Sequence, residues 1–389
     1  MNFSHQLARD LEDPSASLRS FQKLLEPCDD TLLEKRARSS AAITRRFFGR
    51  TMRLFAPLYL SNECINSCAY CGFSRDNPIL RVTLDVEQMA AEAFYLAQQG
   101  FRSVLLVAGE HPKFISNGYL ERCVERLVPL FPSILLEVAP MEQKEYQQLI
   151  KAGAEGILVY QETYNSTVYR ELHTAGPKKD FNWRLDSLQR AYLAGFRRLG
   201  LGVLFGLADW RQEAMALAAH LFFLQRHCWK AQLSVSLLRL RPAAGNFEPR
   251  IFFSDRDLAQ LLFALRMTFP MIQLVMSTRE EAAFRDSMAP LGVTMMSAGS
   301  HTEPGGYTGQ GSEELHYTIQ GKKIEQSCNA KNATKQFEIS DDRSPAAVAG
   351  MLSSLGLEPV WKDWDAGILG EHLTGIEAIE EIANKKCNV

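Results

Sequence analysis

Eight short apolar runs recur along the chain at roughly regular intervals, and this spacing constrains the fold more than any other feature. Amphipathic helix patterns lie between the runs. Strict alternation of strands and helices favours parallel pairing, because parallel neighbours need a long connection. The apolar runs are residues 54–60, 103–108, 134–139, 156–160, 199–205, 233–238, 272–276 and 293–296, and the helix patterns are residues 86–99, 119–130, 143–152, 183–194, 212–227 and 255–269.

Eight strand–helix units over about 250 residues have the size of a closed (βα)₈ barrel of the TIM type. The sequence therefore predicts an α/β protein with three parts. These are a helical N-terminal extension over residues 1–52, the barrel over residues 53–307, and a C-terminal extension over residues 308–389. We expect the C-terminal extension to consist of loop and helix and to pack on the barrel. An open, doubly wound sheet is the main structural alternative.

The C-terminal extension lacks the regular alternation of the barrel. Residues 309–337 are polar without clear periodicity, and we expect a loop there, with an ordered partner surface as the alternative. Residues 341–355 are predicted to form a helix, with Ser340 as a candidate N-cap. Trp361 and Trp364 are expected to pack against the barrel rather than to take part in catalysis.

Composition excludes several classes of protein. Lysine and arginine number 43 against 45 aspartate and glutamate residues, a formal net charge of −2. That balance argues against a dedicated nucleic-acid binder and against a binder of anionic membranes. No apolar run approaches the roughly 18 residues of a membrane span, and the N-terminus has no signal-peptide pattern. Eight cysteines in 389 residues do not indicate a disulfide scaffold, so we expect a cytoplasmic enzyme.

Three cysteines, Cys64, Cys68 and Cys71, follow the first predicted strand directly. Closely spaced thiolates converge readily on one metal centre, and thiolates favour zinc or iron–sulfur clusters. Structural zinc usually takes four protein ligands, but no second cysteine or histidine pair follows downstream. Three cysteines without a fourth instead suit a four-iron cluster with one iron left open. Their position fits as well, because barrel chemistry takes place at the carboxyl ends of the strands.

The spacing C-x₃-C-x₂-C, with an aromatic residue before the last cysteine, resembles the signature of the radical S-adenosyl-L-methionine (SAM) enzymes. The resemblance implies that the three cysteines hold a 4Fe-4S cluster whose open iron chelates SAM. It implies that a 5′-deoxyadenosyl radical formed from SAM takes a hydrogen atom from the substrate, and that Tyr70 lies against the adenine. Residues 108–110 resemble the Gly-Gly-Glu motif that holds the methionine amino group. Because Ala108 replaces the first glycine, this assignment rests on Glu110.

Nine segments, in order along the chain, are similar to the tyrosine lyase family of this superfamily, the 2-iminoacetate synthases of thiamine thiazole synthesis. They are residues 57–84, 105–112, 159–164, 178–185, 238–242, 277–280, 297–307, 341–348 and 359–365. The resemblance implies that the radical takes a hydrogen atom from the amino group of L-tyrosine. The Cα–Cβ bond then breaks to give 2-iminoacetate (dehydroglycine) and p-cresol, with 5′-deoxyadenosine and methionine as co-products. It also implies two partners: thiazole synthase, which would take the labile imine, and a reduced electron donor of the flavodoxin or ferredoxin type.

The same resemblance assigns roles to residues at later strand ends. Glu162 and Arg184 resemble residues that hold the ribose and the carboxylate of SAM. A carboxylate accepts ribose hydroxyls well, and an arginine grips a carboxylate with two hydrogen bonds. Arg279, after the seventh strand, and Ser297, at the end of the eighth, form the candidate clamp for the carboxylate of the substrate.

The sequence leaves two contacts of the substrate open. Arg239 and Arg241, at the end of the sixth strand, are alternatives to Arg279 for the carboxylate. The phenol of the substrate needs a polar partner, for which His111, Tyr164 and Tyr307 are the candidates.

Two other functions compete with the tyrosine lyase. One is a related enzyme of the same branch, acting on tryptophan or in deazaflavin synthesis. The other is a zinc- or cluster-bearing binding scaffold without turnover, in which Glu110, Glu162 and Arg184 have no role. The related lyase of hydrogenase assembly carries a second, C-terminal cluster site with closely spaced cysteines. Here Cys328 and Cys387 stand alone, so the sequence does not support that extra chemistry.

Overall fold

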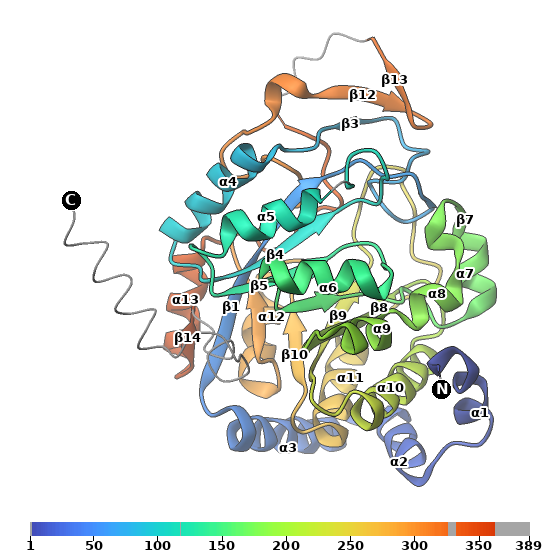
Figure 1. The fold of residues 1–389 in the computed structure, drawn as a ribbon. Coiled ribbons are helices and arrows are strands. Elements are labelled where there is room, and N and C mark those ends of the chain that lie inside the picture. The colour runs from blue at the N-terminus through green and yellow to red at the C-terminus, as the bar shows by residue number, and fades with distance from the viewer. Residues whose placement is uncertain (1, 117, 326–331, 362–389) are drawn as a thin grey trace.

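Eight parallel strands close into a barrel in the computed structural model, which describes residues 2–116, 118–325 and 332–361 (Figure 1). The strands are β1 (Thr51–Ser61), β4 (Ser103–Ala108), β5 (Ser133–Glu137), β6 (Gly156–Leu158), β8 (Arg198–Phe205), β9 (Gln232–Arg239), β10 (Gln273–Met276) and β11 (Met295–Ser297). Each pairs with the next in this order, and β11 pairs back with β1, where Arg53 lies opposite Met295. The predicted closed barrel is confirmed, and the open sheet is wrong.

Helices cover the outside of the barrel between successive strands (Figure 1). They are α4 (Val86–Gln98), α5 (Tyr119–Leu127), α6 (Gln143–Ala152), α7 (Ser166–Leu172), α8 (Phe181–Leu185), α9 (Ser187–Ala194), α10 (Trp210–His227), α11 (Asp255–Thr268) and α12 (Ala282–Met288). The single helix predicted over residues 183–194 is wrong, because Asp186 separates α8 from α9. The Asp186 carboxylate accepts hydrogen bonds from the Ser4 backbone and hydroxyl, at 2.9 and 2.6 Å, and so holds the N-terminal segment against the barrel.

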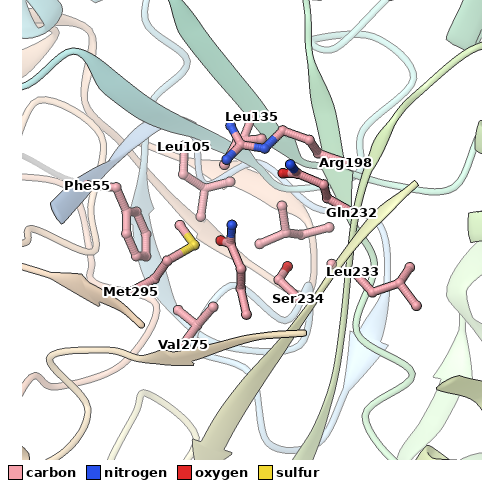
Figure 2. Close-up of a pocket in the computed structure, with 12 residues that line it drawn as sticks. Phe55, Leu105, Leu135, Arg198, Gln232, Leu233, Ser234, Val275 and Met295 are labelled. Carbon is pink, nitrogen blue, oxygen red and sulfur yellow. The ribbon is translucent and has the colours of Figure 1, made fainter. Parts of the chain in front are cut away.

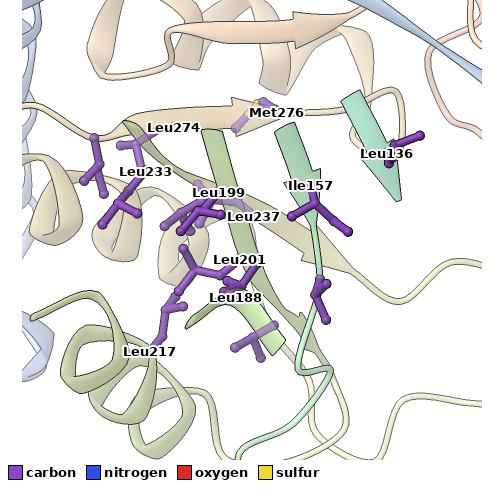
Figure 3. Close-up of a cluster of buried hydrophobic side chains, with 14 of the residues drawn as sticks. Leu136, Ile157, Leu188, Leu199, Leu201, Leu217, Leu233, Leu237, Leu274 and Met276 are labelled. Atoms are coloured by element: carbon purple, nitrogen blue, oxygen red, sulfur yellow. The ribbon is translucent and has the colours of Figure 1, made fainter. Parts of the chain in front are cut away.

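Strand side chains alternate between two apolar layers, as the period of two in a β-strand requires. The outward-facing layer packs against the helices, and Figure 3 shows Leu199 and Leu201 of β8 together with Leu217 of α10 in this cluster. The inward-facing residues, together with Phe73 of the cysteine loop, form a smaller cluster inside the barrel, made of Phe55, Tyr59, Phe73, Leu105, Val107, Leu135, Leu158, Val275 and Met295. This inner cluster lines the interior of the barrel.

Helices of the N-terminal segment cover one end of the barrel (Figure 1). They are η1 (Phe3–His5), α1 (Leu7–Glu12), α2 (Ala16–Leu25) and α3 (Asp30–Phe48). Helices α1 and α2 lie against α10, and α2 and α3 lie against α11. Because the chain passes from α3 into the amino end of β1, this end is opposite the one where the cysteine loop leaves β1. Across the described parts of the chain, no helix is long and apolar enough to span a membrane.

A small antiparallel sheet replaces part of the loop that we predicted over residues 309–337. Strands β12 (His316–Ile319) and β13 (Lys322–Ile324) form a hairpin that pairs with β3 (Ile79–Arg81), just after the cysteine loop. The prediction of a loop is wrong for these described residues. These strands are three and four residues long, too short to give a period, and β12 is held by pairing with a distant segment.

The last helix, α13 (Pro345–Ser354), begins later than predicted. Its N-cap is Ser344, whose side chain accepts a hydrogen bond from the Ala347 backbone, so the assignment of Ser340 is wrong. Asp341 is instead buried in an ion pair with Arg285, and Arg343 lies 2.7 Å from the same carboxylate. These ion pairs hold residues 341–343 outside the helix.

Strand β14 (Glu358–Val360) follows α13 and pairs in parallel with the start of β1. The next residue, Trp361, packs its ring edge-on against Phe101, with 5.2 Å between the ring centroids. This is the packing role that we expected of Trp361. Trp364, Cys387 and the predicted helical end of the C-terminal extension lie outside the described residues, as does Cys328.

Candidate active site

The three cysteines of the C-x₃-C-x₂-C motif line one cavity of about 620 Å³ at the carboxyl end of the barrel strands. Their loop is held from both sides. The Ile65 N–H donates to the Glu110 carbonyl over 2.8 Å, and β2 (Ser67–Cys68) pairs with β7 (His173–Ala175). The buried Arg81 guanidinium donates to the Phe73 and Ser74 carbonyls over 3.0 and 2.8 Å. The fold therefore fixes the loop before any cofactor binds.

The donor set of this cavity fits an iron–sulfur cluster better than a single ion. Among the described residues, no three histidine, cysteine, aspartate or glutamate side chains come close enough to hold one metal ion. Three thiols that line one cavity, without a fourth protein ligand among the described residues, are a donor set that suits a multi-iron cluster. Amide N–H groups also approach the sulfurs: Asn66 Nδ2 lies 3.6 Å from Cys64 Sγ, and Gln336 Nε2 lies 4.0 Å from Cys71 Sγ. Such contacts tune the potential of a cluster.

A buried carboxylate and two cations also line the same cavity. Lys178 Nζ lies 2.8 Å from Glu162 Oε1, and Arg184 lies 3.5 Å from it. Burial alone would raise the pKa of Glu162, but Lys178 and then Arg184 outweigh burial and hold the pKa below its ordinary value. Glu162 also has a φ of 71°, a strained conformation for a residue with a side chain. Strain of this kind clusters at functional sites.

Glu110 lies at the edge of the cysteine loop. Its carboxylate accepts a hydrogen bond from Asn66 Nδ2 over 2.7 Å, and it lines the cavity with the three thiols. The preceding Gly109 is required by close packing, because a Cβ there would come within 2.2 Å of the Glu63 carbonyl oxygen. The glycine of the Ala-Gly-Glu segment therefore lets β4 approach the cysteine loop.

Tyr70 lies behind Cys68 rather than among the side chains that line this cavity. Its hydroxyl lies 2.8 Å from His173 Nε2, and His173 Nδ1 donates to the Tyr169 carbonyl over 2.7 Å. Burial, with a smaller effect of Lys178, lowers the pKa of His173 to about 3, so the ring is neutral. Its Nε2 therefore accepts a hydrogen bond from the Tyr70 hydroxyl. The contact of Tyr70 with adenine stays a prediction.

A second cavity, of about 540 Å³, adjoins the first and shares three lining residues with it, Val107, Glu137 and Tyr160. Both members of the predicted carboxylate clamp, Arg279 and Ser297, line this second cavity. The Arg279 guanidinium stacks on the Phe337 ring, 3.4 Å from its centroid, and makes no ion pair with any carboxylate in the described ranges. Ser297 Oγ accepts a hydrogen bond from the Thr278 N–H, which leaves its hydroxyl proton free to donate.

The alternative residues lie elsewhere. Arg239 is bound in ion pairs with Glu280 and Asp255, and neither Arg239 nor Arg241 lines the second cavity. The Tyr164 hydroxyl bonds to His220 over 2.8 Å, and the Tyr307 hydroxyl donates to the Pro57 carbonyl over 2.6 Å. His111 packs against Phe114. The structure therefore brings none of the three phenol candidates into this cavity, whose polar side chains besides the clamp and Glu137 are Tyr59, Tyr160, Ser236, Ser277, Thr278, Ser300 and Thr302.

A third pocket lies inside the barrel (Figure 2). It shares Phe55, Leu105 and Val275 with that cavity. Figure 2 shows Arg198 and Ser234 among the residues around this pocket. The apolar residues shared by the two spaces give the second cavity an apolar floor.

Four site residues escaped the sequence analysis: Glu137, Lys178, Gln336 and Phe337. Glu137 had a signal, since it is the one acid in the apolar run over residues 134–139. Lys178 lies inside a segment that carried the resemblance, but nothing in its spacing linked it to Glu162. Gln336 and Phe337 fall in the segment predicted to be a loop, where the sequence gives no sign that they reach the barrel.

The fold and the three-thiol cavity define a class of protein, and comparison with known proteins agrees. The sequence pattern of the Radical SAM superfamily matches residues 58–218, and that of the Biotin and Thiamin Synthesis associated domain matches residues 236–358. The protein is a radical SAM enzyme built on a TIM-type barrel.

Individual relatives narrow the assignment. The 2-iminoacetate synthase of Escherichia coli (strain K12) is 42% identical over 344 residues, which cover 88% of this chain and 86% of that protein. The 2-iminoacetate synthase of Salmonella typhimurium (strain LT2) is 40% identical over the same shares. The crystal structure of the FeFe-hydrogenase maturase HydG from Carboxydothermus hydrogenoformans matches with a TM-score of 0.79 and 31% identity, over 93% of this chain and 80% of that one. This chain belongs to the 2-iminoacetate synthase family and is a radical SAM lyase.

Proposed function

We propose that this protein cleaves the Cα–Cβ bond of L-tyrosine to 2-iminoacetate and p-cresol, with 5′-deoxyadenosine and methionine as co-products, for thiamine thiazole synthesis. The observation that carries the proposal is the junction of two cavities. One is ringed by three thiols, and the other holds Arg279 without a carboxylate partner. Membership of the 2-iminoacetate synthase family supports the same reaction.

In this proposal Cys64, Cys68 and Cys71 hold a 4Fe-4S cluster. When bound, the cluster and SAM supply the one-electron chemistry that generates a radical able to take a hydrogen atom from the substrate. Glu162 accepts the ribose hydroxyls of SAM, and the charges of Lys178 and Arg184 keep it ionised for that task despite its burial. The remaining SAM contacts fall to Arg184 for the carboxylate, Glu110 for the amino group and Tyr70 for the adenine.

The second cavity suits an aromatic amino acid. Arg279 pairs with the carboxylate of the substrate, and the Ser297 hydroxyl donates a further hydrogen bond to it. Stacking on Phe337 fixes the plane of the guanidinium, which favours two parallel hydrogen bonds. The aromatic ring of the substrate packs against the apolar floor formed by Phe55 and Leu105.

The proposed reaction also suggests the partner proteins and the cellular compartment. The product imine is hydrolysed by water, so we propose direct transfer to a thiazole synthase, and a reduced flavodoxin or ferredoxin as electron donor. We place the protein in the cytoplasm, where a reduced cluster survives. We retain the division into an N-terminal extension over residues 1–52, a barrel over residues 53–307 and a C-terminal extension over residues 308–389.

The direct test is a product assay with the anaerobically reconstituted protein, SAM, a strong reductant and L-tyrosine. We expect 5′-deoxyadenosine, p-cresol and glyoxylate, the hydrolysis product of 2-iminoacetate, and none of the last two when L-tryptophan replaces L-tyrosine. Formation of 5′-deoxyadenosine without p-cresol would mean that the substrate is wrong. Absence of 5′-deoxyadenosine from protein with an intact cluster would contradict the radical chemistry itself.

A further inference from the structure

One charged side chain stands between the two cavities. Glu137 is the last residue of β5, and it lines both the cavity of the three thiols and the cavity of Arg279. The other two shared residues, Val107 and Tyr160, are uncharged. Any molecule that reaches from one cavity into the other therefore passes the Glu137 carboxylate.

Glu137 is half-buried and, unlike the other two acids that face cations at this end of the barrel, has no cation of its own. Glu162 is paired with Lys178, and Glu280 is paired with Arg239. Glu137 forms no ion pair with any described lysine, arginine or histidine, and the nearby Tyr160 hydroxyl is bonded to the Ser236 hydroxyl over 3.1 Å. Burial of an unpaired carboxylate is costly, so such a group persists where a ligand supplies the missing charge.

The charges of the second cavity match those of a free amino acid. An α-amino acid carries an ammonium and a carboxylate on the same carbon atom. Arg279 offers a cation without a carboxylate partner, and Glu137 offers an anion without a cation, in the same 540 Å³ cavity. Arg279 and Glu137 attract each other across the cavity, but they do not form a direct ion pair. A substrate that contacts both residues satisfies both charges at once.

The reaction also needs a base at this place. A hydrogen atom is removed more easily from a neutral amine than from an ammonium group, because removal from the ammonium leaves a positive charge on the nitrogen radical. The bound amino acid must therefore lose one proton first. Glu137 lies at the junction with the cofactor cavity, where the amino group must point if its N–H bond is to be broken.

We propose that Glu137 binds the α-ammonium group of the amino-acid substrate and accepts one proton from it, so that the amine is neutral when its N–H bond breaks. The inference rests on the proposed function. The step is balanced: the ammonium and the carboxylate become an amine and a carboxylic acid, with no electron transferred. The proton remains on Glu137 and returns to solvent when the products leave.

The electrostatic surroundings of Glu137 suit this task. Burial raises its pKa to about 7, and Arg279 opposes that rise. The other groups that act on it are Glu162 and Tyr160, beyond β6, and Lys178, on the turn η2 (Pro177–Lys179). A base with a pKa near the working pH both accepts and releases a proton readily. Because Glu137 binds a proton as the pH falls through about 7, we expect kcat/KM for L-tyrosine to fall on that acid side.

The test compares Glu137→Gln, Glu137→Asp and a matched control, Glu213→Gln, in the reconstituted holoenzyme. Glu213 is also a buried acid whose pKa burial raises to about 7, but it bonds to Thr163 and lines neither cavity. At pH 7 we expect Glu137→Gln to lower kcat/KM for p-cresol formation by about a hundredfold or more, the usual range for loss of a general base. We expect Glu137→Asp to restore part of the rate and Glu213→Gln to keep the wild-type pH profile.

Two further readouts separate a base from a structural residue. The rate of Glu137→Gln should rise at alkaline pH, where L-tyrosine arrives with a neutral amine. In anaerobic calorimetry, Glu137→Gln should weaken binding of L-tyrosine but not of 3-(4-hydroxyphenyl)propanoate, which lacks the amino group. A wild-type rate and pH profile in Glu137→Gln, or equal weakening of both ligands, would overturn the proposal. If the wild-type protein binds L-tyrosine but forms no p-cresol, the proposed function fails, while the calorimetric comparison still decides the role of Glu137.

Discussion

Replacing Cys68 by alanine should abolish SAM cleavage and p-cresol formation, by more than about a thousandfold, while the barrel remains folded. Cys68 is buried at the centre of the loop, and the three thiols are the only described cysteines that line the cavity. Removing one leaves two thiolates, too few to hold a 4Fe-4S cluster in this loop. Iron content, the brown cluster absorbance and 5′-deoxyadenosine should be lost together.

Cys228→Ala is the matched control for this substitution. Cys228 is equally buried, but it belongs to the core beside α10 and lines neither cavity. We expect it to keep full iron content and turnover, with an unchanged circular dichroism spectrum in both variants. A Cys68→Ala protein that retains both the cluster and SAM cleavage would contradict the assignment of the thiols.

Replacing Arg279 by glutamine should weaken L-tyrosine binding far more than SAM binding. Arg279 supplies the cation of the second cavity, and truncation of one partner of a buried charge pair costs about 2–5 kcal/mol. That range corresponds to a rise of about 30-fold to several thousandfold in the KM for L-tyrosine. Arg279→Lys should recover only part of the loss, because lysine lacks the planar fork that grips a carboxylate.

Arg241→Gln is the informative control, since the sequence left Arg241 as an alternative clamp and the structure keeps it out of the second cavity. We expect its KM for L-tyrosine to stay within about twofold of the wild type. Steady-state kinetics with each substrate varied in turn measures both constants. Equal losses for SAM and L-tyrosine in Arg279→Gln, or a larger loss in Arg241→Gln, would contradict the clamp.

The barrel was predictable because its signal is periodic. Each strand is a run of buried residues, and the helices between them keep their amphipathic pattern, so alternation alone indicated eight parallel strands. Where the predicted helix bounds were wrong, an interaction with a residue distant in the sequence had overridden the local helix pattern. Asp186 divides a predicted helix because it bonds to Ser4, and Asp341 delays α13 because it pairs with Arg285. These partners are more than 50 residues away in the sequence, and no local pattern reveals them.

The site was predictable only in part, for a related reason. The three cysteines lie within eight residues of one another, so their spacing alone indicated that they share one metal centre. Lys178 and Phe337 act through contacts with Glu162 and Arg279, which the barrel and its C-terminal extension bring together. The hairpin of β12 and β13 was missed because its strands are short and one of them pairs with β3, beyond the reach of periodicity.

The most direct test of the account is the source of the hydrogen that ends up in 5′-deoxyadenosine. We propose that the N–H bond of the bound amino acid is broken first, and amine hydrogens exchange with solvent. With unlabelled L-tyrosine in D₂O, mass spectrometry should therefore show 5′-deoxyadenosine that has gained deuterium. If deuterium enters only from L-tyrosine labelled at Cβ, and none comes from D₂O, the chemistry begins at carbon and the account of this site is wrong.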